Sequence, residues 1–172
     1  MRIIRPEIPA DAVAIYEVNQ QAFDGRDAEP GLVDAIRGSE DFIPELSLVA
    51  EEGGHIFGHI LFSRIHIETE KDQFPALALA PMAVRPGHQN QGIGSELVRR
   101  GLEECKRLGY DIIIVLGHPN FYPRFGFSAE MAKSLVCPFG NAGSAWMALE
   151  LNPGALEGVR GRVVYPPPFD HV

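Results

Sequence analysis

The feature that most constrains the fold is a strand, a helix and a second strand in the middle of the chain. Residues 75–84, PALALAPMAV, are almost wholly apolar, as is typical of a strand buried on both faces of a sheet. Residues 92–108 then carry an apolar stripe at helical spacing, and residues 111–117, DIIIVLG, are again apolar and β-branched. Because such a series joins parallel strands by a right-handed crossover, the sequence predicts a mixed α/β fold around these two strands.

Pro81 lies inside the first of these apolar segments. Proline has no N–H group, so it removes one donor from the hydrogen-bond ladder of a sheet. We therefore expect this strand to bulge, or to separate from a neighbour, close to Pro81.

Shorter elements surround this central unit. The Gly53-Gly54 pair predicts a hairpin turn, because both glycines tolerate positive φ. The helix at 92–108 has charges spaced for ion pairs between Glu96 and Arg100 and between Glu103 and Arg107. The remaining pattern predicts strands at 2–5, 46–51, 55–67, 145–151 and 161–165, a helix capped by Asp11, a second helix at 31–37, and a terminal extension from Pro166.

Composition limits the class of protein and its partners. With 172 residues, 45% of them hydrophobic, the chain suits a single domain spanning residues 1–172. A formal charge of -8 argues against nucleic acid and anionic membranes as partners, because binding to phosphates depends on Lys and Arg. No apolar segment reaches the ~20 residues of a membrane-spanning helix. The only two cysteines, Cys105 and Cys137, show no metal-ligand spacing, so we expect no metal site and a reduced cytoplasmic location.

The segment from Val84 to Ser95, VRPGHQNQGIGS, joins the central strand to the helix. Backbone N–H groups at a helix start lack internal partners and carry partial positive charge, so they favour an anion such as a pyrophosphate. Gly92 and Gly94 leave the backbone uncovered, and Ser95 adds a hydroxyl donor. A Walker motif is excluded because no Lys follows, and a dinucleotide-binding GxGxxG would belong to the first strand of the chain.

The order of strand, V-R-P, QNQGIG and amphipathic helix resembles the coenzyme A pyrophosphate loop of the GNAT superfamily of N-acetyltransferases. The resemblance implies a GNAT fold, with about six to seven strands, about four helices and a sheet splayed between strands four and five. It also implies acetyl-CoA as cosubstrate, with the acyl-pantetheine arm lying along the interrupted strand. The cofactor-binding residues that it implies are Met82, Ala83, Val84, Gln89, Asn90, Gln91, Gly92, Ile93, Gly94, Ser95 and, from the next motif, Asn120.

A second motif follows the next strand, as the resemblance requires. Residues 118–127, HPNFYPRFGF, are similar to the family segment in which a tyrosine precedes a Gly-Phe pair. Tyr122 takes the place of that tyrosine, and a phenol is able to protonate or hydrogen-bond a leaving thiolate. The alternative is that Tyr122 is one more aromatic side chain in a cluster with neighbouring phenylalanines.

The group that deprotonates the amine is left open by the sequence. Many family members carry a glutamate on the strand before the loop, and residues 75–84 contain none. His118 follows the fifth strand, and His66 and Glu68 end the third, so each is a candidate. Cys105 lies on the apolar stripe of the helix and Cys137 precedes Pro138, so we interpret both as structural, which favours direct attack of the amine over a covalent enzyme intermediate.

These observations predict an N-acetyltransferase that acts on a primary amine of a small molecule or peptide. A non-catalytic acyl-CoA-binding module is the alternative, because the strand glutamate is absent. The acidic segment 24–29, DGRDAE, lies where the family selects its acceptor, which favours a cationic acceptor. The oligomeric state is not fixed by the sequence, and a homodimer stays open.

Overall fold

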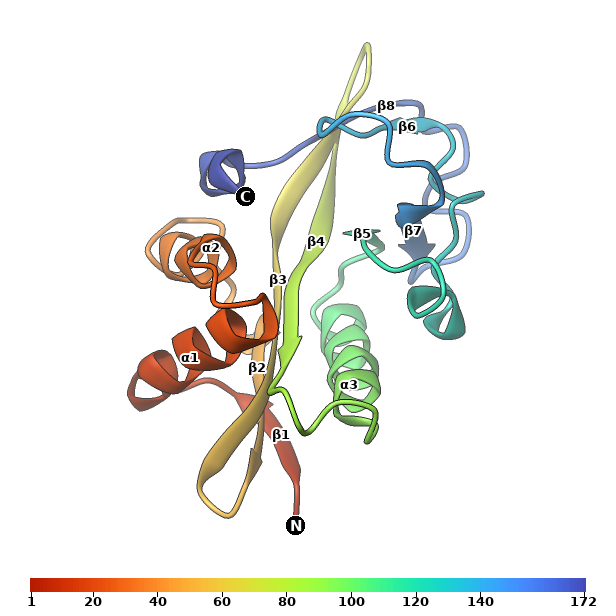
Figure 1. The fold of residues 1–172 in the computed structure, drawn as a ribbon. Coiled ribbons are helices and arrows are strands. Elements are labelled where there is room, and N and C mark those ends of the chain that lie inside the picture. Colours follow the sequence, from red (N-terminus) through yellow and green to blue (C-terminus); the bar gives the residue numbers. More distant parts are fainter.

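An eight-stranded sheet forms the centre of the computed structural model, which describes residues 1–172 (Figure 1). Its main path runs β1-β2-β3-β4-β5-β7, while β8 pairs with the far end of β3 and with β6. Only β4 with β5 and β6 with β8 are parallel pairs. The strands are β1 (Ile3–Pro6), β2 (Ser47–Glu52), β3 (His55–Glu68), β4 (Gln73–Val84), β5 (Ile112–Leu116), β6 (Leu135–Val136), β7 (Trp146–Glu150) and β8 (Gly161–Val164).

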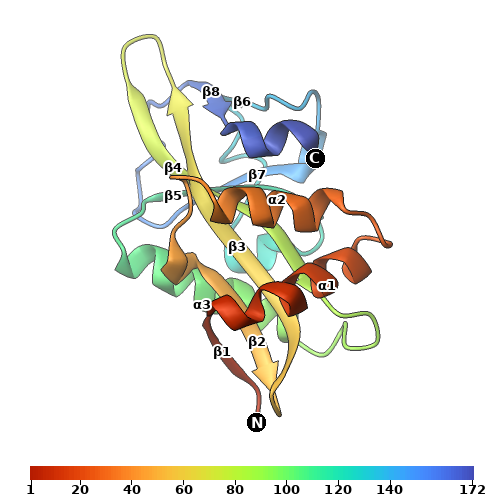
Figure 2. The ribbon, with the colours of Figure 1, turned by 90° about the vertical axis from the view of Figure 1, so that its left-hand side faces the viewer.

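Three α-helices cover the two faces of this sheet (Figures 1 and 2). Helices α1 (Ala12–Ala22) and α2 (Ala28–Arg37) lie on one face, and α3 (Ile93–Arg107) lies on the other. Accordingly, the buried side chains form two clusters, one beneath α1 and α2 and one beneath α3. None of the helices combines the length and the apolar composition needed to cross a membrane.

The sheet is open between β4 and β5. The two strands pair only at Leu77 with Ile113 and at Ala78 with Ile114. Beyond Ala78, β4 continues beside β3 as far as Val84, whereas β5 stays with β7. This arrangement confirms the predicted mixed sheet that splays between its fourth and fifth strands.

The predicted irregularity at Pro81 is a bulge on β4. Phe62 pairs with Leu79 and Ile60 pairs with Met82, so Ala80 and Pro81 together face Leu61 alone. The extra residue bends β4 just where it leaves β5.

Two glycines allow α3 to approach β3 closely, and α3 carries the glycine-rich loop at its start. A Cβ atom on Gly58 would lie 2.9 Å from Ile93 Cγ2, and one on Gly101 would lie 2.3 Å from Phe62 Cε1. The helix therefore sits on the sheet at a distance that larger residues would not permit, and its first turn is held in place beside β4.

A buried polar network holds α1 and α2 on their face of the sheet, which is the face opposite α3. His59 on β3 is fully buried; Asn19 Nδ2 lies 3.1 Å from its Nδ1, and its Nε2 lies 2.9 Å from Ser47 Oγ. Ser47 also bonds Glu7, whose carboxylate pairs with Arg37 at 2.8 Å. Since Asn19 supplies a donor to Nδ1, His59 is neutral with its proton on Nε2. Burial, reinforced by the charge of Arg37, lowers the pKa of His59 to about 3.

Several details differ from the sequence prediction. Asp11 directly precedes α1, but its side chain bonds Arg5 and the N–H of Ile8 and makes no capping hydrogen bond to α1. Arg107 pairs with Glu104 and not with Glu103. Helix α2 begins at Ala28 and not at Gly31. Glu96 pairs with Arg2 of β1 and not with Arg100, because β1 passes beside α3. The segment after Pro166 is not a bare extension: residues 167–171 form a 3-10 turn beside α2, and Phe169 in it is buried (Figures 1 and 2).

We expect Gly101→Ala to lower the free energy of unfolding by about 1–2 kcal/mol. The gain in helix propensity is about 0.5–1 kcal/mol, but the overpacking against buried Phe62 costs about 1–3 kcal/mol. Gly31→Ala in α2 is the matched control, because its Cβ would meet nothing within 4 Å, and it should stabilise the fold by about 0.4–1 kcal/mol. Urea denaturation of both variants measures this, and equal effects would contradict the tight contact.

The pKa of His59 predicts a loss of stability on mild acidification. In the unfolded chain the imidazole binds a proton below about pH 6.5, whereas in the folded chain it stays neutral down to about pH 3. The free energy of unfolding is therefore highest above pH 6.5 and decreases as the pH falls, by roughly 1.5 kcal/mol between pH 6.5 and about pH 5.

Urea denaturation at several pH values in this range should show this decrease in the free energy of unfolding for the wild type and for the exposed control His55→Gln, but not for His59→Gln. The same decrease in the His59 variant would mean that another group causes it.

Candidate active site

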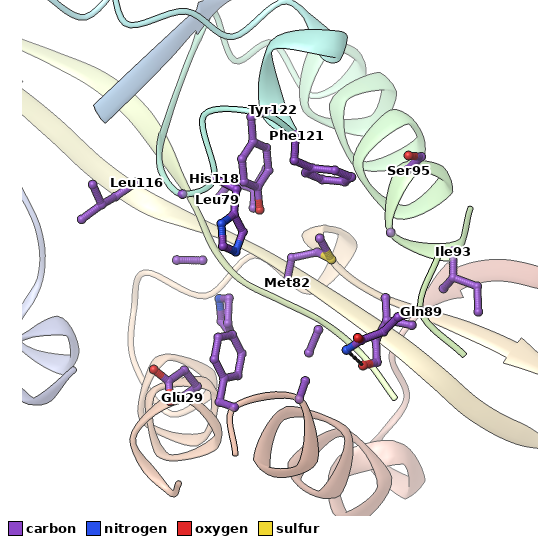
Figure 3. A pocket seen from close by; sticks show the side chains of 18 of the residues that line it. Glu29, Leu79, Met82, Gln89, Ile93, Ser95, Leu116, His118, Phe121 and Tyr122 are labelled. Atoms are coloured by element: carbon purple, nitrogen blue, oxygen red, sulfur yellow. Dashed lines mark hydrogen bonds between the residues drawn. The ribbon is translucent and has the colours of Figure 1, made fainter. Parts of the chain in front are cut away.

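A cavity of about 870 Å³ occupies the gap between β4 and β5. Residues from both faces of the sheet line it: Phe23, Glu29 and Leu32 come from the α1–α2 side, and Gly94 and Tyr122 come from the α3 side. The cavity thus passes through the sheet where the two strands separate (Figure 3).

The loop before α3 gives one end of the cavity its backbone donors. Gly92 is the N-cap of α3 with φ 85, and the first helical bond runs from Glu96 N–H to Gly92 O at 3.0 Å. The N–H groups of residues 93–95 therefore have no partner within the helix. No side chain covers them at Gly94, where a Cβ would lie 3.3 Å from Met82 Cε. The backbone of this turn fits an anion such as a pyrophosphate.

The edge of β4 that faces the gap offers a second row of backbone groups. Arg85 N–H donates to Phe57 O on β3 at 2.8 Å, and alternate residues of an antiparallel strand face opposite sides. Met82 and Val84 therefore direct their N–H groups away from β3, into the gap. Consistently, Val84 O accepts a hydrogen bond from Gln89 Nε2 at 3.2 Å on that side. An extended ligand can pair with this edge as an added strand does.

Tyr122 lies on the α3 side, at the start of the short 3-10 turn Tyr122–Phe125, which follows β5 along the chain. The residue is only 7% exposed, and its ring packs edge-on against Phe121 and Phe127, with centroids 5.0 and 5.8 Å away. Gly117 makes room for it, because a Cβ there would lie 2.5 Å from Tyr122 Cε2. The hydroxyl points into the cavity, and burial raises the pKa of Tyr122 to about 12 (Figure 3).

Most residues that the sequence singled out line this one cavity. Its lining includes Met82, Ala83, Val84, Gln89, Asn90, Gly92, Ile93, Gly94, Ser95, His118 and Tyr122. Two others lie outside the lining: Gln91 bonds back to Gly87 O, and Asn120 is exposed with its carbonyl bonded to Arg124.

The other candidates for the base lie elsewhere. His66 and Glu68 belong to the part of β3 that pairs with β8, and neither lines the cavity. Only His118 among the three candidates does so. Cys105 is buried beneath α3, where burial raises the pKa of its thiol, so it is a poor nucleophile.

Two charged residues of the cavity were missed by sequence reasoning. Arg124 lines the α3 side, its guanidinium lying 4.7 Å from the ring centroid of Phe121. Glu29 lines the α2 side, and one of its carboxylate oxygens is buried without a partner. The acidic composition of residues 24–29 indicated the segment but did not distinguish Glu29 from Asp24 or Asp27, because only the fold shows which carboxylate faces inward.

Comparison with known proteins defines the class of the chain. Residues 12–127 match the family model described as the acetyltransferase (GNAT) family. The chain therefore belongs to the GNAT family of acetyltransferases, and it is an acyltransferase.

Individual relatives extend this likeness over nearly the whole chain. The uncharacterized N-acetyltransferase YhbS of Escherichia coli strain K12 is 36% identical over 164 residues, which cover 95% of each chain. A crystal structure of YhbS from Escherichia coli in complex with CoA superposes with a TM-score of 0.89 and 32% identity, over 98% of this chain and 91% of that one. A Brucella melitensis GNAT acetyltransferase in complex with acetyl-CoA has a TM-score of 0.79 and 32% identity, over 99% of both chains.

Proposed function

We propose that this chain transfers an acetyl group from acetyl-CoA to a primary amine of a small molecule or peptide. The observation that carries the proposal is the cavity that crosses the sheet, with the free donors at the start of α3 on one face. The relatives crystallised with CoA and acetyl-CoA support it at 32% identity. The continuous sheet supports one catalytic domain spanning residues 1–172, and the two free cysteines suit the cytoplasm.

The α3 side of the cavity fits the cosubstrate. The backbone donors of residues 92–95 and the side chain of Ser95 would hold its pyrophosphate, and Arg124 adds a positive charge to the same wall. The acyl-bearing arm would lie along the free edge of β4, where Met82 and Val84 present N–H groups. One of these donors is also placed to stabilise negative charge on the thioester oxygen, a contribution of about 3 kcal/mol where such donors have been removed from other enzymes.

Tyr122 is the group that we assign to the leaving thiolate. Because the pKa of its hydroxyl is about 12, the phenol keeps its proton at neutral pH and is able to donate it. Its position is fixed on several sides by Phe121, Phe127 and the space at Gly117.

The amine enters from the opposite face and attacks the thioester directly. No nucleophilic intermediate is needed, because holding the two reactants together contributes about 7–11 kcal/mol of the barrier in well-oriented systems. His118 is the base that we favour, since it lines the cavity (Figure 3).

Thiol release from acetyl-CoA across a panel of alkylamines, polyamines, amino acids and peptides tests the proposed function. We expect turnover with at least one class of primary amine. Tight acetyl-CoA binding without turnover on any amine would instead identify a non-catalytic acyl-CoA-binding module.

Tyr122→Phe should lower kcat by roughly 10²- to 10⁴-fold, because the leaving thiolate loses its proton donor. The KM for acetyl-CoA should change little, since the ring and its packing remain. Steady-state kinetics at neutral pH measures both values, with Tyr110→Phe as a control outside the cavity. An unchanged kcat would remove Tyr122 from the reaction.

A further inference from the structure

Glu29 stands out among the cavity residues because its charge is incompletely paired. It projects from the first turn of α2 into the cavity, from the side opposite Tyr122 (Figure 3). The side chain is 12% exposed. Oε2 lies 3.3 Å from Arg26, whose own side chain is 61% exposed, while Oε1 is buried and has no hydrogen-bond partner.

A buried carboxylate oxygen without a donor is unfavourable, and a ligand that supplies an N–H group removes the penalty. A carboxylate in the first turn also favours the dipole of α2. That role alone is fulfilled equally well by a carboxylate in water, and it does not account for a side chain that lines a cavity.

The walls around Glu29 indicate what kind of group reaches it. Phe23, Leu32, Leu116 and Val172 line the same cavity, and all four are apolar. A single carboxylate in a cavity that also has apolar walls suits a hydrocarbon chain or ring that ends in a cationic nitrogen, because a charge-assisted hydrogen bond is stronger in a partly buried site than in water.

The nitrogen that Glu29 binds differs from the one that is acetylated. Glu29 lies on the side of the cavity opposite Tyr122, the group assigned to the leaving thiolate, so a nitrogen bound at Glu29 is not the one beside the thioester (Figure 3). The carboxylate stabilises that distant nitrogen in its protonated form. The reacting nitrogen must be neutral, whereas the nitrogen at Glu29 is stabilised as a cation.

We propose that Glu29 determines acceptor specificity by binding a second, positively charged nitrogen of the acceptor. The acceptor class is then an amine that carries another cationic group beyond a short apolar spacer. This inference rests on the proposed acetyltransferase function and names the substrate class for it.

Straight-chain diamines and n-alkylamines of matching length are the probes. In the wild type, the diamines should give the higher kcat/KM. Glu29→Gln keeps the shape of the side chain and removes its charge, so it should raise the KM for diamines by roughly 10- to 100-fold. The kcat for diamines, the KM for monoamines and the KM for acetyl-CoA should stay close to their wild-type values.

Asp24→Asn is the matched control. It removes one charge from the same acidic segment, but Asp24 is exposed and does not line the cavity. Asp24 has φ 57, a conformation that Asn also tolerates. This variant should keep the preference for diamines, and Glu29→Asp, which retains the charge, should bind diamines more tightly than Glu29→Gln does.

Calorimetry of diamine binding to the CoA-bound protein separates this inference from the proposed function. Weaker diamine binding in Glu29→Gln alone supports the role of Glu29, even if no acetyl transfer occurs. Equal diamine binding by wild type and Glu29→Gln, or equal use of diamines and monoamines by the wild type, overturns it while leaving the acetyltransferase function intact.

Discussion

The separation of β4 from β5 is the constraint on which the rest of the structure depends. Two residues of β4 pair with β5, and then the strands diverge, so the centre of the sheet contains an edge with free backbone groups. Unpaired backbone groups in a protein interior are unfavourable unless a ligand or water satisfies them. The bulge at Ala80 and Pro81 sustains the divergence, and the cavity occupies the space that it creates.

The two faces of the sheet contribute different groups to this opening. On one face, the close approach of α3 to Gly58 and Phe62 holds the start of the helix beside β4, so its free N–H groups border the cavity. On the other face, the network around His59 anchors α1 and α2, and these helices carry Phe23 and Glu29 to the same cavity. In the proposed reaction, the cosubstrate and the acceptor therefore approach from opposite sides and meet in the gap.

Local patterns in the sequence predicted much of this arrangement. The apolar run interrupted by Pro81 predicted a central strand with a bulge, and the bulge is present. The QNQGIG loop and Tyr122 were expected at one site, and both line one cavity. Long-range contacts were predicted less well. Glu96 pairs with Arg2, 94 residues away, because β1 lies beside α3, and helical spacing carries no information about that neighbour.

By itself, the sequence determined the order of elements, the glycines at the start of α3 and the likeness to the GNAT family, because these depend on residues close together along the chain. Only the tertiary structure decided which side chains face the opening. It buried Phe169 beside α2, left Gln91 and Asn120 outside the cavity, and directed Glu29 into it. The physical reason is that burial and hydrogen-bond partners are set by segments distant in sequence, so the three carboxylates at 24, 27 and 29 acquire different surroundings only when α2 packs on the sheet.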